Sequence, residues 1–375
     1  MNNSNDFKSI GMREILIALL LFVFMIVHPR YLGLRGEALS LLPVTFLTLP
    51  SLFLYLYALV NRKIKRETFN FLIVIAFFIL YVGIKLYRGM DSIGKEGDRD
   101  DALYQSVLYF LQGIYPFDKA TFCQPAPITC GPASVLFSLP FVFFFNNINI
   151  FPVFVMAFII FYLWKYVEKE TGYPILTLAL SVMVFFPYFN WCYWESAEDI
   201  LCGWPFLYLS LFIFLKGRIK TAWLRFFIIG ILLGISCMFR ISYLFPAAAV
   251  LFLILRNNLK YLAYSVLGAV LIVILLSLPF LVLNYKHFLS GYLWGTALYT
   301  RGNFEMLFFV IIVLFQLYCT VIRKLPLASQ AHILIALSAI AAYVYSGLLL
   351  IPWHVYYWMI PLLIALPFIE RPQRE

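Results

Sequence analysis

The sequence predicts an all-α polytopic membrane protein, and three features support this fold class. Hydrophobic residues make up 63% of the 375 residues and charged residues only 12%, whereas a soluble domain is about 45–50% apolar and about 25% charged. The apolar residues form repeated runs of roughly 15 to 23 residues, the length that a bilayer core about 30 Å thick requires of a helix. The charged residues lie mainly between these runs. Water-soluble enzyme folds are therefore excluded.

About twelve apolar segments are expected to cross the membrane as helices, within a single integral membrane domain that covers residues 1–375. The first segment is not followed by the small-residue cleavage site of a signal peptide, so we interpret it as a span. The predicted spans are 14–28, 39–60, 69–87, 150–166, 173–189, 200–215, 222–239, 241–255, 261–283, 306–322, 331–351 and 357–369.

Basic residues orient these spans, because loops rich in lysine and arginine stay in the cytoplasm. The two strongest clusters are Arg62, Lys63, Lys65 and Arg66, and Lys216, Arg218, Lys220 and Arg225. Both clusters face the cytoplasm only if the apolar segment 133–145 does not cross, and this segment is short enough for a re-entrant piece. We therefore expect a re-entrant 133–145 and two cytoplasmic termini. With this topology 18 of the 28 basic residues lie on the cytoplasmic side.

The net charge of +10 is then a topology signal, and no nucleic-acid partner is expected. The expected location of the protein is the plasma (inner) membrane in a prokaryote or the endoplasmic reticulum membrane in a eukaryote. The longest stretch outside the cytoplasm is 88–149, and ionisable groups at the mouth of a helix bundle are where chemistry is expected. Within it, Cys123 and Cys130 form either a disulfide or two free thiols.

Three carboxylates lie close together near the start of this loop, at Asp98, Asp100 and Asp101. They open a predicted amphipathic helix, whose apolar stripe runs from Leu103 to Ile114 and leaves Gln105 and Gln112 on another face. One interpretation is that the acids only complement the positive end of the helix dipole. The other is that they perform acid–base chemistry. Carboxylates this close repel one another, so folding alone would not favour the cluster.

The order of the following motifs resembles that of a known enzyme family. An Asp-x-Asp, an aromatic residue at Tyr104, the sequence Gly113-Ile114-Tyr115-Pro116-Phe117 and a proline-rich stretch lead into 133–145. This order is similar to the first extracytoplasmic loop of GT-C-fold glycosyltransferases that use a polyprenyl-phosphate sugar. The nearest patterns are the catalytic subunit of GPI mannosyltransferase I and bacterial polyprenyl-phosphomannose-dependent mannosyltransferases, which make lipid-linked mannosides.

Weaker similarity to this family continues as far as residue 365. Asn190–Asp199 takes the place of a short polar motif, Gly230 to Gly234 with the following Arg240 resembles a glycine-rich span that ends in a basic residue, and Trp353–Trp358 resembles a late aromatic motif. Two features depart from the family pattern. Three predicted spans precede the acidic loop where one is usual, and arginine replaces the usual lysine at 240.

The resemblance implies a GT-C-like helix bundle with interfacial helices in the 88–149 loop, and a membrane-embedded hexosyltransferase of glycolipid biosynthesis. Such an enzyme moves a hexose, here mannose by similarity, from a polyprenyl-phosphate donor to a lipid-linked or glycolipid acceptor on the extracytoplasmic face. The family inverts the anomeric centre, and a direct displacement needs one general base. Asp100 is the first choice for this base, and Asp98 or Asp101 would orient the acceptor or hold a divalent cation. Whether Mg²⁺ or Mn²⁺ takes part is left open.

Other polar residues of the outer side could bind the two substrates. Arg240, His354 and Arg301 are candidates for the donor phosphate, because a guanidinium binds phosphate bidentately. Glu195, Tyr104 and Tyr356 are candidates for the acceptor or the sugar, and His287 is a weaker cationic candidate in the loop 284–305. For the arginines the alternative is an interfacial side chain that reaches the headgroups, and for the aromatic residues an interfacial belt.

Two other functions compete with glycosyl transfer. A transporter or flippase for a lipid-linked saccharide would carry charges near the bilayer midplane and have broken spans, whereas the acids here gather at one surface. An O-antigen-type polymerase or ligase relies on arginine and histidine in outer loops, and Arg240, His287 and Arg301 keep this alternative open.

Overall fold

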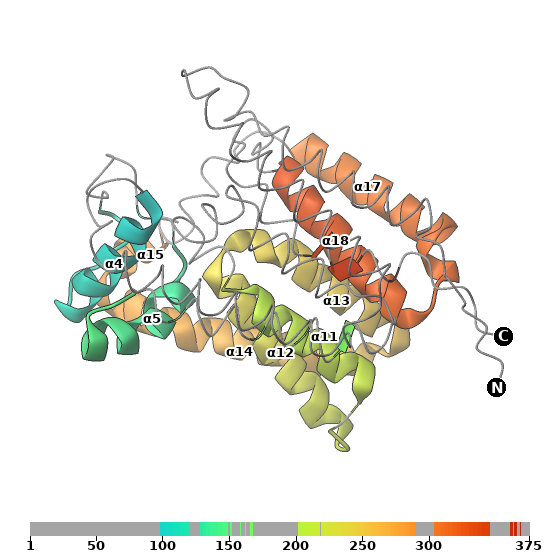
Figure 1. Ribbon diagram of the computed structural model, residues 1–375, viewed down its shortest axis with the longest axis horizontal. Helices are drawn as coiled ribbons and strands as arrows, with labels where there is room; N and C mark the ends of the chain where they lie inside the picture. The colour runs from blue at the N-terminus through green and yellow to red at the C-terminus, as the bar shows by residue number, and fades with distance from the viewer. Residues whose placement is uncertain are drawn as a thin grey trace, which may run out of the picture. The chain divides into compact units, whose positions relative to one another are not determined.

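The computed structural model describes a helical part of the chain (Figure 1). Of these residues 84% are helical, and no strand occurs among them. All of them belong to one compact unit, made of Lys85–Tyr173 and Glu195–Glu375. The residues described are 98–119, 128, 130–148, 151, 158, 162, 166–167, 202–217, 219–289, 304–345, 361–362, 364–365 and 368.

Two helices have the length and composition of membrane spans: α12 (Ala222–Phe239) and α14 (Leu259–Leu283). They match the predicted spans 222–239 and 261–283. Large apolar side chains of α14, such as Leu267, Leu275 and Val282, are 60%, 60% and 77% exposed. In water this exposure would be costly, whereas lipid tails would cover it.

The remaining predicted spans are seen in part or lie outside the described residues. Four more predicted spans coincide with observed helices: α11 (Trp204–Lys216), α13 (Leu244–Asn257), α17 (Phe304–Thr320) and α18 (Leu327–Tyr345). Short 3₁₀ helices precede α13 and α18, at η3 (Ile241–Tyr243) and η5 (Ile322–Lys324). Spans 14–28, 39–60, 69–87 and 173–189 lie outside the description, and 150–166 and 357–369 are described at single positions.

Glycines let α12 and α14 pack backbone against backbone. A Cβ atom at Gly230 would overlap the carbonyl of Ser265, and one at Gly268 would overlap the carbonyl of Phe227. The Ser265 hydroxyl adds a bond across the interface, since its Oγ donates to the Phe226 carbonyl at 2.9 Å. Small residues at a helix interface are typical of membrane proteins, where close backbone packing drives association.

A hydrogen-bonded cluster joins α13, α17 and α18 at one end. Arg256 Nη1 donates to Tyr318 Oη at 2.9 Å and to Gln330 Oε1 at 2.7 Å. Gln330 Nε2 in turn donates to the Leu325 carbonyl at 2.6 Å. The cluster fixes the turn between α17 and α18 against the C-terminal end of α13.

Replacing Arg256 with methionine is expected to lower the free energy of unfolding by about 1 kcal/mol, because both acceptors lose a charge-assisted donor at a part-exposed position. A lower thermal midpoint of the purified protein in detergent would show this. Arg323→Met is the matched control, since Arg323 is exposed in the adjacent η5. Equal losses in the two variants would contradict the role of the cluster.

Histidine 332 is buried in an aromatic cluster that joins α18 to positions 162 and 368. Its Nδ1 donates to the Ala328 carbonyl at 2.7 Å, and its Nε2 lies 3.1 Å from Tyr162 Oη. The ring stacks on Phe368 with the centroids 4.0 Å apart. Because both ring nitrogens have partners, this histidine is a core residue.

Two shorter helices, α4 (Asp98–Leu111) and α5 (Pro132–Phe145), pack together beside the end of α14. Each has 14 residues, which gives a length of about 21 Å against a bilayer core about 30 Å thick. The segment after α4 shares their core. The buried core residues are Ala102, Leu103, Val107, Tyr115, Phe117, Ile128, Cys130, Val135, Val142, Ile148 and Phe280.

The α4 helix differs from the sequence expectation in how its faces are buried. Leu103 and Val107 of the predicted apolar stripe are 1% and 0% exposed, but Leu111 and Ile114 of the same stripe are 42% and 38% exposed. Gln105, which the pattern places on the polar face, is only 1% exposed. α4 packs against α5 and shares a core with the segment that follows α4, so more of its surface is covered than in a helix that lies alone on a membrane.

Candidate functional site

The three clustered aspartates occupy the first turn of α4, and for them the structure describes the backbone. Residues three or four positions apart share a face of a helix. Asp98 and Asp101 are therefore neighbours on one face, while Asp100 shares a face with Tyr104. Asp101 is three positions from Tyr104 as well, so the helical register places both Asp100 and Asp101 next to this tyrosine.

Tyr104 links the acidic turn to the far end of α5. Its hydroxyl donates to Asn146 Oδ1 at 3.1 Å, and Asn146 caps α5 with a left-handed backbone at φ 47°. Tyr104 was a candidate for sugar binding, and the structure gives it a structural partner as well. Tyr104 therefore connects α4 to the C-terminal end of α5.

Arg240 lies next to the opposite end of α5. It follows α12 with an extended backbone, and the carbonyl of the preceding Phe239 accepts hydrogen bonds from Gly131 N at 3.1 Å and Ser134 Oγ at 3.5 Å. A Cβ atom at Gly131 would overlap the Met238 and Phe239 carbonyls. Only glycine therefore allows the start of α5 to sit against the chain that leads into Arg240.

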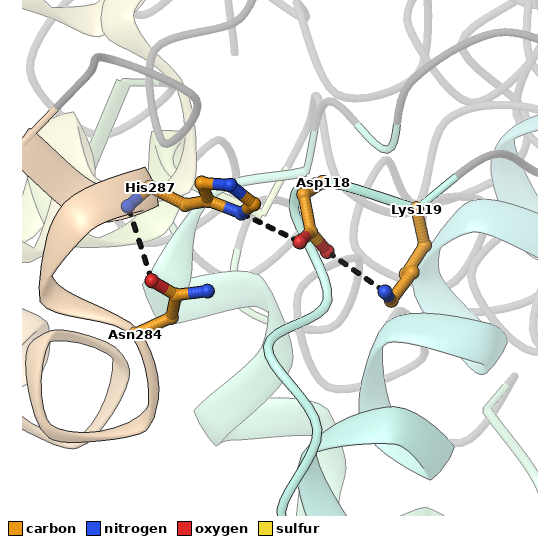
Figure 2. Close-up of polar contacts among 4 residues, drawn as sticks. All are labelled: Asp118, Lys119, Asn284 and His287. Carbon is orange, nitrogen blue, oxygen red and sulfur yellow. Dashed lines mark hydrogen bonds and ion pairs between the residues drawn. The ribbon is translucent and has the colours of Figure 1, made fainter.

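A histidine–aspartate pair joins the segment after α4 to α15 (Tyr285–Leu289). His287 Nδ1 donates to Asp118 Oδ2 at 2.6 Å, and Lys119 Nζ lies 3.5 Å from Asp118 Oδ1. Figure 2 shows the Asp118 carboxylate between the two basic side chains. Asn284 Oδ1 accepts from the backbone N–H of His287 at 3.2 Å, which holds the start of α15.

Tyr115 packs beside this pair and stays protonated. Its ring lies edge-on to His287, with the centroids 6.2 Å apart, and its side chain is buried. Burial, and secondly the charge of Asp118, raise the pKa of the Tyr115 phenol well above its ordinary value. Its Oη is buried and makes no hydrogen bond within the described part of the chain.

Sequence reasoning missed Asp118. A single aspartate in a proline-containing turn gives no pattern, and its partner His287 lies 169 positions away in the sequence. One signal was available: the predicted topology places 88–149 and 284–305 on the same side of the membrane. A carboxylate in one segment and a histidine in the other were therefore candidates for a pair.

The other predicted site residues, Glu195, Arg301, His354 and Tyr356, lie outside the described residues. Cys123 does too, so its pairing with Cys130 stays a prediction. Cys130 Sγ itself lies 3.2 Å from Ser106 Oγ. Among the described side chains, no group of three His, Cys, Asp or Glu residues is arranged to hold a metal ion.

No protein-family model, no curated protein and no solved structure matches the chain. The function is therefore argued from the sequence motifs and from the arrangement of the described residues.

Proposed function

We propose that the protein is an integral membrane glycosyltransferase of the GT-C type, with about twelve spans and cytoplasmic termini. It moves a hexose, most simply mannose, from a polyprenyl-phosphate donor to a lipid-linked acceptor at the extracytoplasmic face. Asp100 is the general base that takes the proton of the acceptor hydroxyl. Arg240 binds the donor phosphate, and Asp98 and Asp101 orient the acceptor.

The observation that carries the proposal is that α5 contacts both an acidic and a basic segment, one toward each of its two ends. The acidic first turn of α4 leads through Tyr104 to α5, and the start of α5 leads through Gly131 to the chain before Arg240. The same core extends to Phe280 near the end of α14. A transferase needs this combination, because a base must act on the acceptor while a cation stabilises the departing phosphate.

Contacts between distant segments support the proposed topology. Gly131 contacts Phe239, and Asp118 contacts His287; the charge pattern assigns all four to the extracytoplasmic side. At the other end, Arg256 contacts Gln330, where the charge pattern assigns the cytoplasmic side. Each contact joins two segments with the same expected location.

The donor explains why this chemistry would need a membrane-embedded chain. A prenyl tail is soluble only in the bilayer, so the phosphate and sugar at its head are delivered at the membrane surface. The exposed apolar side of α14, including Leu271 and Ile274, is a surface along which such a tail can lie.

The transporter alternative gains no support from the described spans. Within α12 and α14, the charged residues Arg225 and Lys260 lie in the first turn, away from the bilayer midplane where a transporter binds its substrate. The buried His332 has partners on both nitrogens. A polymerase or ligase would use the outer cations Arg240 and His287, and the donor test below separates it from the proposal.

The test is hexose transfer by the purified full-length protein in detergent, with a membrane-lipid extract as acceptor. We expect transfer from polyprenyl-phosphate mannose and none from a nucleotide-linked mannose, and a product whose anomeric configuration is inverted relative to the donor. A polymerase or ligase would instead consume a polyprenyl-diphosphate oligosaccharide. Translocation of a lipid-linked saccharide in proteoliposomes without any transfer would contradict the proposal in favour of a flippase.

A further inference from the structure

The Asp118 carboxylate is more buried than the basic side chains that surround it. The Asp118 side chain is 13% exposed, whereas those of His287 and Lys119 are 44% and 41% exposed. Lys286, next to His287, is exposed as well. A ligand that approaches this surface therefore meets basic groups first, with a single carboxylate behind them.

Among the described residues, Asp118 is the carboxylate that contacts these basic side chains. Its two oxygens already face His287 and Lys119, so it orients both basic side chains. A histidine held at Nδ1 by a carboxylate has its ring orientation fixed. Donors and positive charge of this kind fit a phosphate group.

The position of the pair indicates which phosphate. His287 lies four residues after Leu283, the last residue of the apolar 25-residue helix α14. A group just beyond the end of a span lies at the level of the lipid headgroups. The phosphate of a membrane lipid would therefore be at the same depth as this pair, with its apolar tail beside α14.

We infer that His287 and Lys119, positioned by Asp118, bind the phosphate of the polyprenyl-phosphate donor. This assignment rests on the proposed function and adds a second cationic contact to Arg240. His287 and Lys119 touch the ligand, whereas Asp118 is a positioning residue that acts through His287.

The test measures binding of polyprenyl monophosphate to the purified full-length protein in detergent. His287→Gln keeps a donor for Asp118 but removes the basic imidazole, and we expect it to raise the Kd about tenfold. Lys119→Gln is expected to act in the same direction, and His287→Arg to restore binding. Lys260→Gln is the matched control, because it removes an exposed charge from the other end of α14 and should leave the Kd unchanged.

Two further probes identify the source of the phosphate. Polyprenol, which lacks phosphate, should bind weakly and equally to all variants. If phosphatidylglycerol competes with polyprenyl monophosphate at equal concentration, the site binds headgroups and the donor assignment is overturned. If His287→Gln binds as tightly as the wild type and only its thermal midpoint falls, the pair is a structural link between α15 and the 115–119 segment, and the inference is overturned.

Kinetics separate this inference from the proposed function. In the transfer assay, His287→Gln should raise the KM for the donor about tenfold and leave kcat within about threefold, as expected for a lost binding contact. Normal transfer with an unchanged donor KM would overturn the phosphate site and leave the glycosyltransferase intact. Charge-dependent binding without transfer from any donor would leave the site standing and remove the proposed function.

Discussion

Replacing Asp100 with asparagine is expected to lower kcat for hexose transfer by a factor of about 10²–10⁴, because the acceptor hydroxyl loses the group that takes its proton. The KM for the donor should change little, since Asp100 is assigned no contact with the phosphate. Initial rates with radiolabelled polyprenyl-phosphate hexose, measured for the purified variant and the wild type side by side, would show both effects.

Asp98→Asn is the matched control for this change. It removes the same charge from the same turn of α4, so both variants lose a similar favourable interaction with the helix dipole, about 0.3–1 kcal/mol. Because Asp98 is proposed to orient the acceptor, Asp98→Asn should mainly raise the KM for the acceptor, whereas Asp100→Asn should lower kcat by the factor given above. If Asp100→Asn retains full activity while Asp98→Asn or Asp101→Asn loses it, the base is a different member of the cluster. If all three stay active, the acids serve the helix dipole alone.

Replacing Gly268 with leucine is expected to cost about 3 kcal/mol or more of folding free energy, because there is no space for a side chain between α12 and α14. Even a Cβ atom would overlap the Phe227 carbonyl, so the two backbones would have to move apart. Separation would also break the bond from Ser265 Oγ to the Phe226 carbonyl. The thermal midpoint of the purified protein in detergent, or its yield from membranes, is the measurement.

Ala263→Leu controls for adding the same apolar group to the same helix. Ala263 is exposed on α14, where lipid or detergent would accept a larger side chain. The thermal midpoint of this variant should equal that of the wild type. If Gly268→Leu is equally harmless, α12 and α14 do not pack through these glycines.

The apolar helices were the most predictable part of the described residues, because length and hydropathy alone indicate them, and two of them have the length and composition of membrane spans. The segment 222–239 coincides with α12, and the short 133–145 coincides with the 14-residue α5. What these patterns could not give is which face of each helix is covered. Gln105 lies on the polar face of α4 by periodicity, yet it is only 1% exposed.

The glycines of α12 have a packing role in addition to their resemblance to a family motif. Gly230 and Gly234 drew attention through their resemblance to a family motif. In the structure they face α14, where a Cβ at Gly230 would overlap Ser265 and one at Gly234 would overlap Ile272. Their partner Gly268 lies in a different span, and a pairing between spans is not visible in the local pattern of either one.

The candidate site was predictable only where its residues cluster along the chain. The aspartates at the start of α4 form such a cluster and were found. Asp118 and His287 are 169 positions apart in the sequence, and only tertiary packing brings their side chains to within 2.6 Å of each other. Long-range pairs of this kind can be anticipated by assigning loops to the same side of the membrane, which narrows the choice of partners without selecting one.

The most direct test of the central claim is the mass of the acceptor lipid after incubation with polyprenyl-phosphate mannose and the purified protein. We predict that wild-type protein adds one hexose to the acceptor, and that Asp100→Asn protein with an unchanged thermal midpoint adds almost none in the same time. The contradicting result is an acceptor whose mass stays unchanged when folded wild-type protein is supplied with each polyprenyl-phosphate sugar in turn. Glycosyl transfer would then not be the function.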